Sequence, residues 1–136
     1  MKTISPEVKN VVVFEDNHTW RSRYRGVLED FSWIIVGEAV DMQTALKLIE
    51  KMKDLQVSLA LIDGIIEEQG ANIRLAEVYK VQGRVIAEKI KAAYPNVVTL
   101  GVSGVTYLQE SDPNIDYAVG KEHGPITQAI QNISKK

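Results

Sequence analysis

Short apolar runs, each followed by polar or turn residues, recur along the 136-residue chain. They are Val11–Phe14, Trp33–Gly37, Leu59–Ile62, Val97–Val102 and Tyr117–Val119. A continuous apolar run of this length is typical of a strand that is buried on both faces, as in a parallel sheet covered by helices. The pattern therefore predicts five strands of one parallel sheet.

The segments between these runs show the apolar spacing of helices. Between the first two runs the apolar residues are Trp20, Tyr24, Val27, Leu28 and Phe31, at spacings of four, three, one and three. Similar stripes comprise Ala45, Leu48, Ile49 and Met52, with Thr44 as the expected N-cap, and Ile126, Ala129, Ile130 and Ile133 near the end. A further stripe from Leu75 to Ala93 contains Gly83, which leaves either one long helix or two pieces. Strands that alternate with helices predict right-handed crossovers.

Composition narrows the class of protein. The net charge of -2 gives no support for a nucleic-acid-binding surface. The chain has no cysteine, which excludes disulfides, thiolate metal sites and cysteine nucleophiles. The segment Met1–Asn10 lacks the apolar core of a signal peptide, and no segment approaches the ~20 apolar residues of a membrane span. We expect one cytoplasmic domain over residues 1–136.

Reactive side chains follow four of the five predicted strands. Glu15 and Asp16 follow the first strand, Asp63 the third, Ser103 the fourth and Lys121 the fifth. The carboxyl ends of parallel strands meet at one edge of the sheet, where ligands bind. Clustered carboxylates favour a shared Mg²⁺, while a hydroxyl and an ammonium suit the oxygens of a phosphoryl group. The set predicts a site in which Asp63 is the nucleophile towards phosphorus.

With these positions in this order, the chain resembles the receiver domains of two-component response regulators. The resemblance covers nearly the whole chain and implies a doubly wound α/β fold. This is the (βα)5 flavodoxin-like three-layer sandwich, with a parallel sheet of strand order 2-1-3-4-5. It also implies that Asp63 accepts a phosphoryl group from a histidine kinase or a histidine phosphotransfer protein. Beyond its own phosphoryl transfer and dephosphorylation, such a domain is not an enzyme.

The resemblance further implies a role for each residue of the site. Asp16 and Asp63 would coordinate Mg²⁺ directly, the backbone carbonyl of Ile65 would be a further ligand, and Glu15 would act through water. Ser103 would bind a phosphoryl oxygen and move on activation, and Lys121 would pair with the phosphoryl group.

The chain departs from the family pattern near the expected switch. The position three residues before the lysine, which usually holds the switch aromatic, is Ala118. Tyr117 stands one place earlier, so a local bulge is needed if Tyr117 serves as the switch aromatic. Glu122 follows the lysine, in the place of the common proline.

Two segments also differ in length from the pattern. The glycine expected soon after the phospho-acceptor is Gly83, twenty residues after Asp63, so we expect an insertion near residues 66–82. The acidic pair Glu67–Glu68 within it is expected to be a solvated loop. The fourth helix, near residues 105–115, is expected to be short and is interrupted by Asp112-Pro113-Asn114.

Simpler interpretations remain open at single positions. The acidic pair could only complement a helix dipole, Asp63 could only begin a turn, and Tyr117 could be a core residue. His18 and His123 are expected to be exposed, and Trp20 to belong to the core.

Two alternative functions compete with the phospho-acceptor. One is a receiver-like docking module for other proteins that phosphorylation does not regulate. The other is a hydrolase of the haloacid-dehalogenase type, which is disfavoured because Ile65 occupies the place of its second aspartate. For a receiver, output would pass through a downstream protein partner or a missing output domain, with no nucleic-acid or membrane contact by this domain.

Overall fold

The computed structural model describes residues 9–64, 76–103 and 112–135, with side chains in the third helix from Gly83 onward. The strands are β1 (Asn10–Phe14), β2 (Ile34–Ala39), β3 (Leu59–Asp63), β4 (Val98–Ser103) and β5 (Tyr117–Gly120). The helices are α1 (His18–Asp30), α2 (Met42–Leu55), α3 (Ala76–Ala93) and α4 (His123–Ser134). Each predicted strand is present to within one or two residues.

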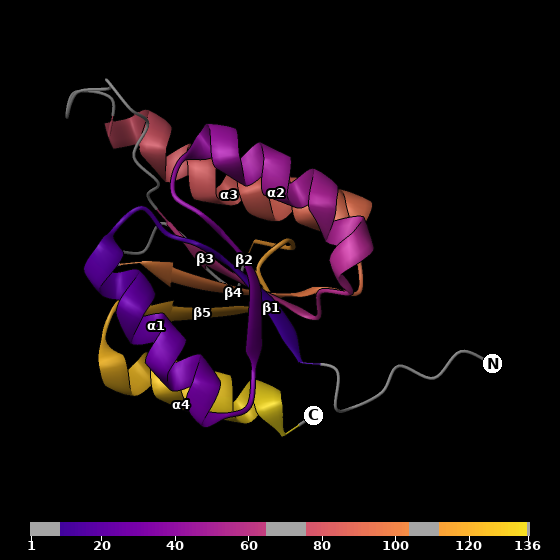
Figure 1. Cartoon of the computed structure of the whole chain (residues 1–136). Helices are drawn as coiled ribbons and strands as arrows, with labels where there is room; N and C mark the ends of the chain where they lie inside the picture. The colour runs from indigo at the N-terminus through magenta and orange to yellow at the C-terminus, as the bar shows by residue number, and fades with distance from the viewer. Residues whose placement is uncertain (1–8, 65–75, 104–111, 136) are drawn as a thin grey trace.

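The strands form one parallel sheet in the order β2-β1-β3-β4-β5, as predicted. Helices α2 and α3 cover one face of the sheet, and α1 and α4 cover the other (Figure 1). This arrangement confirms the doubly wound three-layer fold. The helix predicted near residues 105–115 falls mostly on residues outside the described ranges, and the described part, 112–116, forms turns.

Two separate cores fill the spaces between the layers. Alternate residues of β1 face opposite sides, so that Val12 and Phe14 pack against α2 and α3 while Val11 and Val13 pack against α1 and α4. All five residues of β3 are buried. A strand with both faces covered needs apolar residues at every position, which explains why the run is continuous in the sequence.

The start of α2 differs from the prediction. Asp41, rather than Thr44, is the N-cap residue, and the two form a reciprocal capping box. The Thr44 backbone N–H donates to Asp41 Oδ1 at 2.8 Å, and the Asp41 backbone N–H donates to Thr44 Oγ1 at 3.1 Å. Thr44 is therefore the third residue of the helix, and its hydroxyl accepts the backbone N–H of the N-cap residue.

Helix α3 runs continuously through Gly83, which settles the alternative of one helix or two pieces. A Cβ atom on Gly83 would lie 2.6 Å from the carbonyl oxygen of Asp63 and 2.9 Å from that of Gly64. The absence of a side chain therefore lets α3 pack directly on the backbone that follows β3. The first turns of α3, residues 76–82, belong to the predicted insertion, whereas Glu67 and Glu68 lie outside the described residues.

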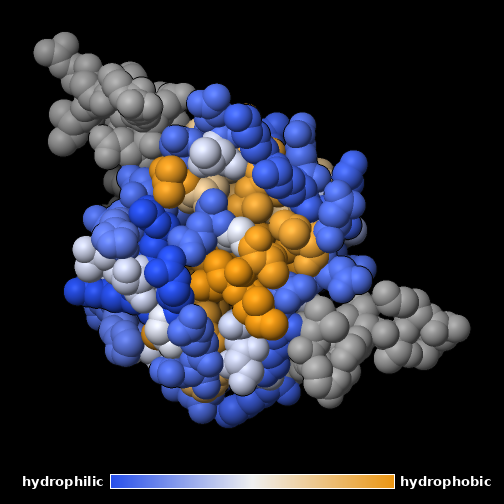
Figure 2. Space-filling model, viewed as in Figure 1, coloured by the Kyte–Doolittle hydropathy of each residue, from blue (hydrophilic) through white to orange (hydrophobic). Residues whose placement is uncertain are grey.

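Hydrophobic side chains gather on the face that carries β2 and α2, as Figure 2 shows. The exposed members are Ile34, Leu46 and Val40, with 62%, 43% and 39% of their surfaces accessible. Strand β2 lies at the edge of the sheet, and its pairing with β1 shifts register at Val11/Val12. None of the described helices is both long enough and apolar enough to cross a membrane.

Candidate functional site

The acidic pair lies where β1 ends. The Glu15 backbone N–H donates to the Ala39 carbonyl at 3.0 Å, so Glu15 continues the pairing of β1 with β2. Asn17 then begins α1 as its N-cap, and its side-chain oxygen accepts the Trp20 N–H at 3.0 Å. The side chain of Glu15 is fully buried and that of Asp16 is half-buried.

The remaining predicted groups lie at the same edge of the sheet. Asp63 is the last residue of β3 and is 4% exposed, and Ser103 is the buried last residue of β4. The Lys121 backbone N–H donates to the Ser103 carbonyl at 3.0 Å, which places Lys121 beside the end of β4. The parallel topology therefore brings these strand ends together, as the sequence predicts.

The ammonium group of Lys121 contacts two of the three carboxylates in this cluster. Glu15, Asp16 and Asp63 each offer an oxygen, and these oxygens lie within 4.8 Å of one another. Lys121 Nζ lies 3.2 Å from Asp63 Oδ1, and 3.0 and 3.2 Å from the two carboxylate oxygens of Glu15. Formal charge at this edge is consequently negative, in a site that is largely shielded from water.

Burial raises the pKa values of two carboxyl groups of the cluster, those of Asp63 and Glu15. Burial, followed by the charge of Glu15, raises the pKa of Asp63 to about 8, although Lys121 opposes the shift. Burial also raises the pKa of Glu15, again against the effect of Lys121. Burial alone would lower the pKa of Lys121, but the charges of Asp63 and Glu15 outweigh it and raise that pKa.

This donor set fits Mg²⁺. Carboxylate oxygens are the ligands that this cation prefers, and a divalent charge would oppose the burial and the repulsion from Glu15 that raise the pKa of Asp63. Asp16 and Asp63, with Glu15 beside them, are the described residues that would hold the cation. Ile65, whose carbonyl was expected as a further ligand, lies outside the described residues.

Tyr24 is a residue of the site that sequence reasoning missed, since it was assigned only to the apolar stripe of α1. Its hydroxyl donates to Glu15 Oε1 at 2.9 Å, and the side chain is 1% exposed. Burial and the negative charge of Glu15 raise the pKa of Tyr24 far above its ordinary value. The available signal was chemical: a buried tyrosine hydroxyl needs a partner, and the acidic pair that begins at Glu15 precedes Tyr24 closely on the chain.

Trp20 and Arg21, also on α1, line the same edge. Arg21 Nη1 donates to the carbonyl oxygens of Glu15 and Asp16 at 3.1 and 2.9 Å. The Trp20 ring is half-buried and packs against the core below α1, as predicted. Its ring centroid also lies 5.4 Å from Lys121 Nζ, so the indole contacts the site as well as the core.

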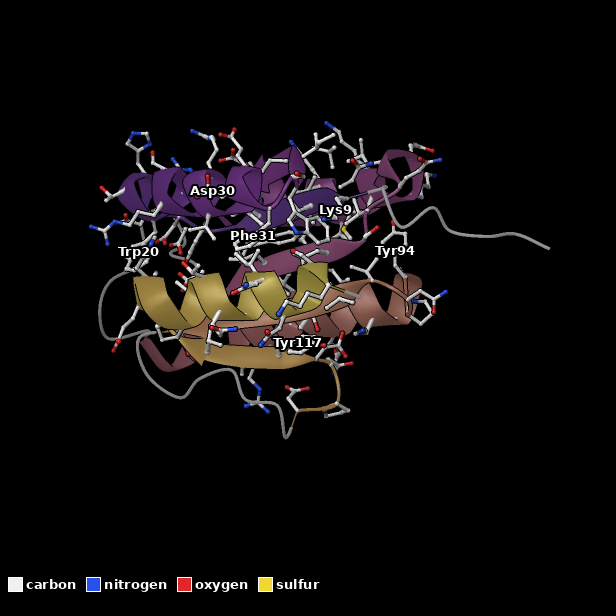
Figure 3. The ribbon with its side chains drawn as sticks, turned by 90° about the horizontal axis from the view of Figure 1, so that it is seen from below. Lys9, Trp20, Asp30, Phe31, Tyr94 and Tyr117 are labelled. Atoms are coloured by element: carbon white, nitrogen blue, oxygen red, sulfur yellow. The ribbon has the colours of Figure 1, made fainter. Side chains whose placement is uncertain are left out.

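Tyr117 lies away from this cluster. It is the first residue of β5, is half-buried, and packs against the core between the sheet and α1 and α4 (Figure 3). Pairing of β4 with β5 is regular from Leu100–Tyr117 to Ser103–Gly120, so the bulge that the switch role required is not present in this ladder. His18 and His123 are exposed, as expected.

Comparison with solved structures identifies the fold. RcsB response regulator of Salmonella typhimurium matches with a TM-score of 0.70 and 19% identity, over 95% of this chain and 61% of that one. The isolated REC domain of RcsB, solved with phosphomimetic BeF3-, matches with a TM-score of 0.69 and 19% identity. This match covers 93% of this chain and 88% of the REC domain. A CheY-like receiver domain protein from Methanospirillum hungatei matches with a TM-score of 0.70 and 16% identity, over 94% of each chain.

These similarities concern the backbone rather than the sequence. No protein-family model and no curated protein matches the sequence. The chain matches only part of RcsB, since the match covers 61% of the length of the RcsB chain. Strand order, helix placement and the structural matches lead to the same conclusion: the chain has the fold of response regulator receiver domains.

Proposed function

We propose that the chain is a phospho-acceptor receiver domain that takes a phosphoryl group on Asp63 with the help of Mg²⁺. The observation that carries the proposal is the clustering of the carboxylates of Glu15, Asp16 and Asp63 at the carboxyl edge of this fold, with the ammonium of Lys121 against two of them, Glu15 and Asp63. A buried set of this kind is costly unless a cation or a ligand uses it.

The reaction follows from the chemistry of these groups. A carboxylate oxygen of Asp63 attacks the phosphorus of a phosphohistidine, the P–N bond breaks, and its electron pair stays on the imidazole of the donor protein. The product is an acyl phosphate on Asp63. Lys121, next to Asp63, and Ser103, at the end of the adjacent strand, would bind the phosphoryl oxygens. A bound Mg²⁺ would supply positive charge that favours the ionised form of Asp63.

The partners follow as part of the proposal. The phosphoryl donor would be a histidine kinase or a histidine phosphotransfer protein, and phosphorylation would change binding to a downstream protein or to an output domain. The structural neighbours support this direction: the RcsB receiver domain was solved with the phosphomimetic BeF3-, and RcsB itself with promoter DNA.

The test is intact mass after incubation with acetyl phosphate and Mg²⁺. We expect the wild type to gain one phosphoryl group and the Asp63→Asn variant to gain none. Asp30→Asn is the matched control, because Asp30 is an exposed carboxylate at the far end of α1. It should take up phosphate as the wild type does.

The opposite result would favour the docking module. A folded wild type that gains no phosphoryl group with saturating Mg²⁺ would contradict the proposal. A folded Asp63→Asn variant that is phosphorylated as fast as the wild type would show that another residue is the acceptor.

A further inference from the structure

We propose that Tyr24 is a positioning residue that, through Glu15, sets how Lys121 is shared between Glu15 and Asp63. The inference rests on the proposed function and assigns to α1 a part in controlling phosphoryl binding. It starts from a hydroxyl group that lies in an apolar helix face and points at the site.

The position of Tyr24 is one that an aliphatic side chain could fill. It lies in the middle of the buried face of α1, together with Val27 and Leu28, and is 1% exposed. A hydroxyl placed there is costly without a partner. Its partner is Glu15 Oε1 at 2.9 Å, so the tyrosine places a donor beneath the acidic cluster.

Donors of the protein surround the Glu15 carboxylate. Oε1 receives Tyr24 OH and lies 3.0 Å from Lys121 Nζ. Oε2 accepts the Asn17 N–H and Lys121 Nζ, both at 3.2 Å. These contacts from three residues hold the Glu15 carboxylate in one orientation. Glu15 is therefore a fixed anion that competes with Asp63 for the lysine.

Trp20 also contacts the lysine. Its ring centroid lies 5.4 Å from Lys121 Nζ, within the range of a cation–π contact, and 5.8 Å from the ring of Tyr24. The two aromatic residues stand one helical turn apart on α1. One supports the anion that attracts Lys121, and the other contacts the ammonium itself.

Removal of the hydroxyl should shift this balance in one direction. In Tyr24→Phe, Glu15 loses one donor and its charge is less compensated. Glu15 then holds Lys121 more strongly, and the lysine is less available to a phosphoryl group on Asp63. The same added negative potential favours a divalent cation. The variant should therefore bind Mg²⁺ more tightly and a phosphoryl analogue more weakly.

The experiment measures both affinities on the full chain. Mg²⁺ affinity is measured by calorimetry, and beryllofluoride affinity at saturating Mg²⁺ by the fluorescence of Trp20 in a Trp33→Phe background. That background leaves one tryptophan of the two in the chain. We expect Tyr24→Phe to lower the Kd for Mg²⁺ and raise that for beryllofluoride, each by roughly fivefold, which lies within the range of the net contribution of one typical hydrogen bond.

Two further variants separate positioning from damage to the fold. Tyr94→Phe removes a hydroxyl that donates to the Ile49 carbonyl at 2.6 Å at the other end of the molecule, far from Trp20 (Figure 3). It should leave both affinities unchanged. In a Glu15→Gln background, Tyr24→Phe should lose its effect on both ligands, because the anion through which it acts is gone.

The outcomes distinguish this inference from the proposed function. If the wild type binds both ligands and Tyr24→Phe weakens both or changes neither, the positioning role is wrong while the receiver function stands. If Tyr24→Phe fails to fold, Glu15→Gln alone decides: it should weaken Mg²⁺ binding and tighten beryllofluoride binding, and any other pattern contradicts the inference. A folded wild type that binds neither ligand would overturn both proposals.

Discussion

Two lysines, at opposite edges of the sheet, are equally buried and yet have different surroundings. The side chains of Lys91 and Lys121 are each 17% exposed. Lys91 Nζ lies 2.6 Å from one carboxylate, that of Asp116, which also accepts the Thr99 N–H at 2.9 Å. Lys121 instead lies between the carboxylates of Glu15 and Asp63, with Asp16 nearby.

The difference separates a balanced ion pair from a cluster with an excess of negative charge. At the Lys91 end, the charges of Lys91 and Asp116 balance one to one, and Asp116 keeps 34% of its side-chain surface in contact with water. Two hydrogen bonds between Thr99 and Asp116, one donated by each backbone N–H, fix the start of β5. At the Lys121 end, the carboxylates outnumber the cation and are shielded from water, which raises the pKa of Asp63. Folding alone would not favour such an arrangement, whereas binding of a cation would.

The largest difference should appear when each lysine is replaced by methionine. At pH 8 without metal, Lys121→Met leaves two buried carboxylates without a counter-ion, and we expect a loss of about 3–5 kcal/mol in the free energy of unfolding. Lys91→Met should cost about 1–2 kcal/mol, because Asp116 is partly solvated and keeps its other donor. Urea unfolding measures both values. Equal losses would contradict the comparison.

The next prediction concerns pH. The pKa of Asp63 is about 8 in the folded protein and about 4 in the unfolded chain, so the folded state binds more protons between these values. Stability without metal should therefore fall as pH rises from about 4 to 8. Asp63→Asn removes this loss and should be the more stable protein at pH 8, by on the order of 5 kcal/mol, with little difference at pH 4.

Asp116→Asn is the matched variant at the other edge. It removes the partner of Lys91, so it should be less stable than the wild type at pH 8 rather than more stable. Thermal unfolding of both variants across this pH range, with chelator present, measures the sign of each effect. A destabilised Asp63→Asn at pH 8 would show that Asp63 is not under electrostatic strain.

A smaller effect is expected from crowding at the Lys121 end. In Gly83→Ala the new methyl group would lie 2.6 Å from the Asp63 carbonyl, and we expect a loss of about 2 kcal/mol together with weaker Mg²⁺ binding. Gly26→Ala, on an open surface of α1, should instead stabilise the protein by up to about 1 kcal/mol. Chemical unfolding and calorimetry give the two readouts. A stable Gly83→Ala with normal Mg²⁺ affinity would show that the close packing of α3 is dispensable.

The smallest effect should come from Thr99 at the Lys91 end. Its hydroxyl donates to the Asn114 carbonyl at 2.6 Å and accepts the Asp116 N–H at 3.0 Å. Thr99→Val should cost about 1 kcal/mol in urea unfolding, since both groups lose a partner. The Kd for Mg²⁺ should not change. A shift in that Kd would mean that the two edges of the sheet are coupled.

The sequence was sufficient to predict the sheet and the groups at its carboxyl edge. Continuous apolar runs predict buried parallel strands, and parallel strands bring Asp63 and Lys121 to the same edge whatever the loops do. The prediction that Thr44 caps α2 was wrong. A capping box is reciprocal, so the sequence alone allows either Asp41 or Thr44 as the N-cap residue. Which residue is the cap depends on backbone angles that the sequence does not display.

Contacts between residues that are distant along the chain could not be predicted from the sequence. Tyr24 reads as one more apolar residue of α1, and only the folded geometry shows that its hydroxyl meets Glu15. The contact between Gly83 and the backbone of Asp63 likewise depends on the angle at which α3 packs on β3. The role of Ile65, the form of the 66–75 segment and the switch role of Tyr117 stay predictions.

The most direct test of the central claim is the melting temperature of the wild type, at pH 8, with chelator and with saturating Mg²⁺. If the carboxylates of Glu15, Asp16 and Asp63 form a cation site, Mg²⁺ should raise the melting temperature, since a hundredfold excess over Kd stabilises by about 2.7 kcal/mol. Asp63→Asn should show a much smaller rise. Identical melting of the wild type with chelator and with Mg²⁺ would contradict the account.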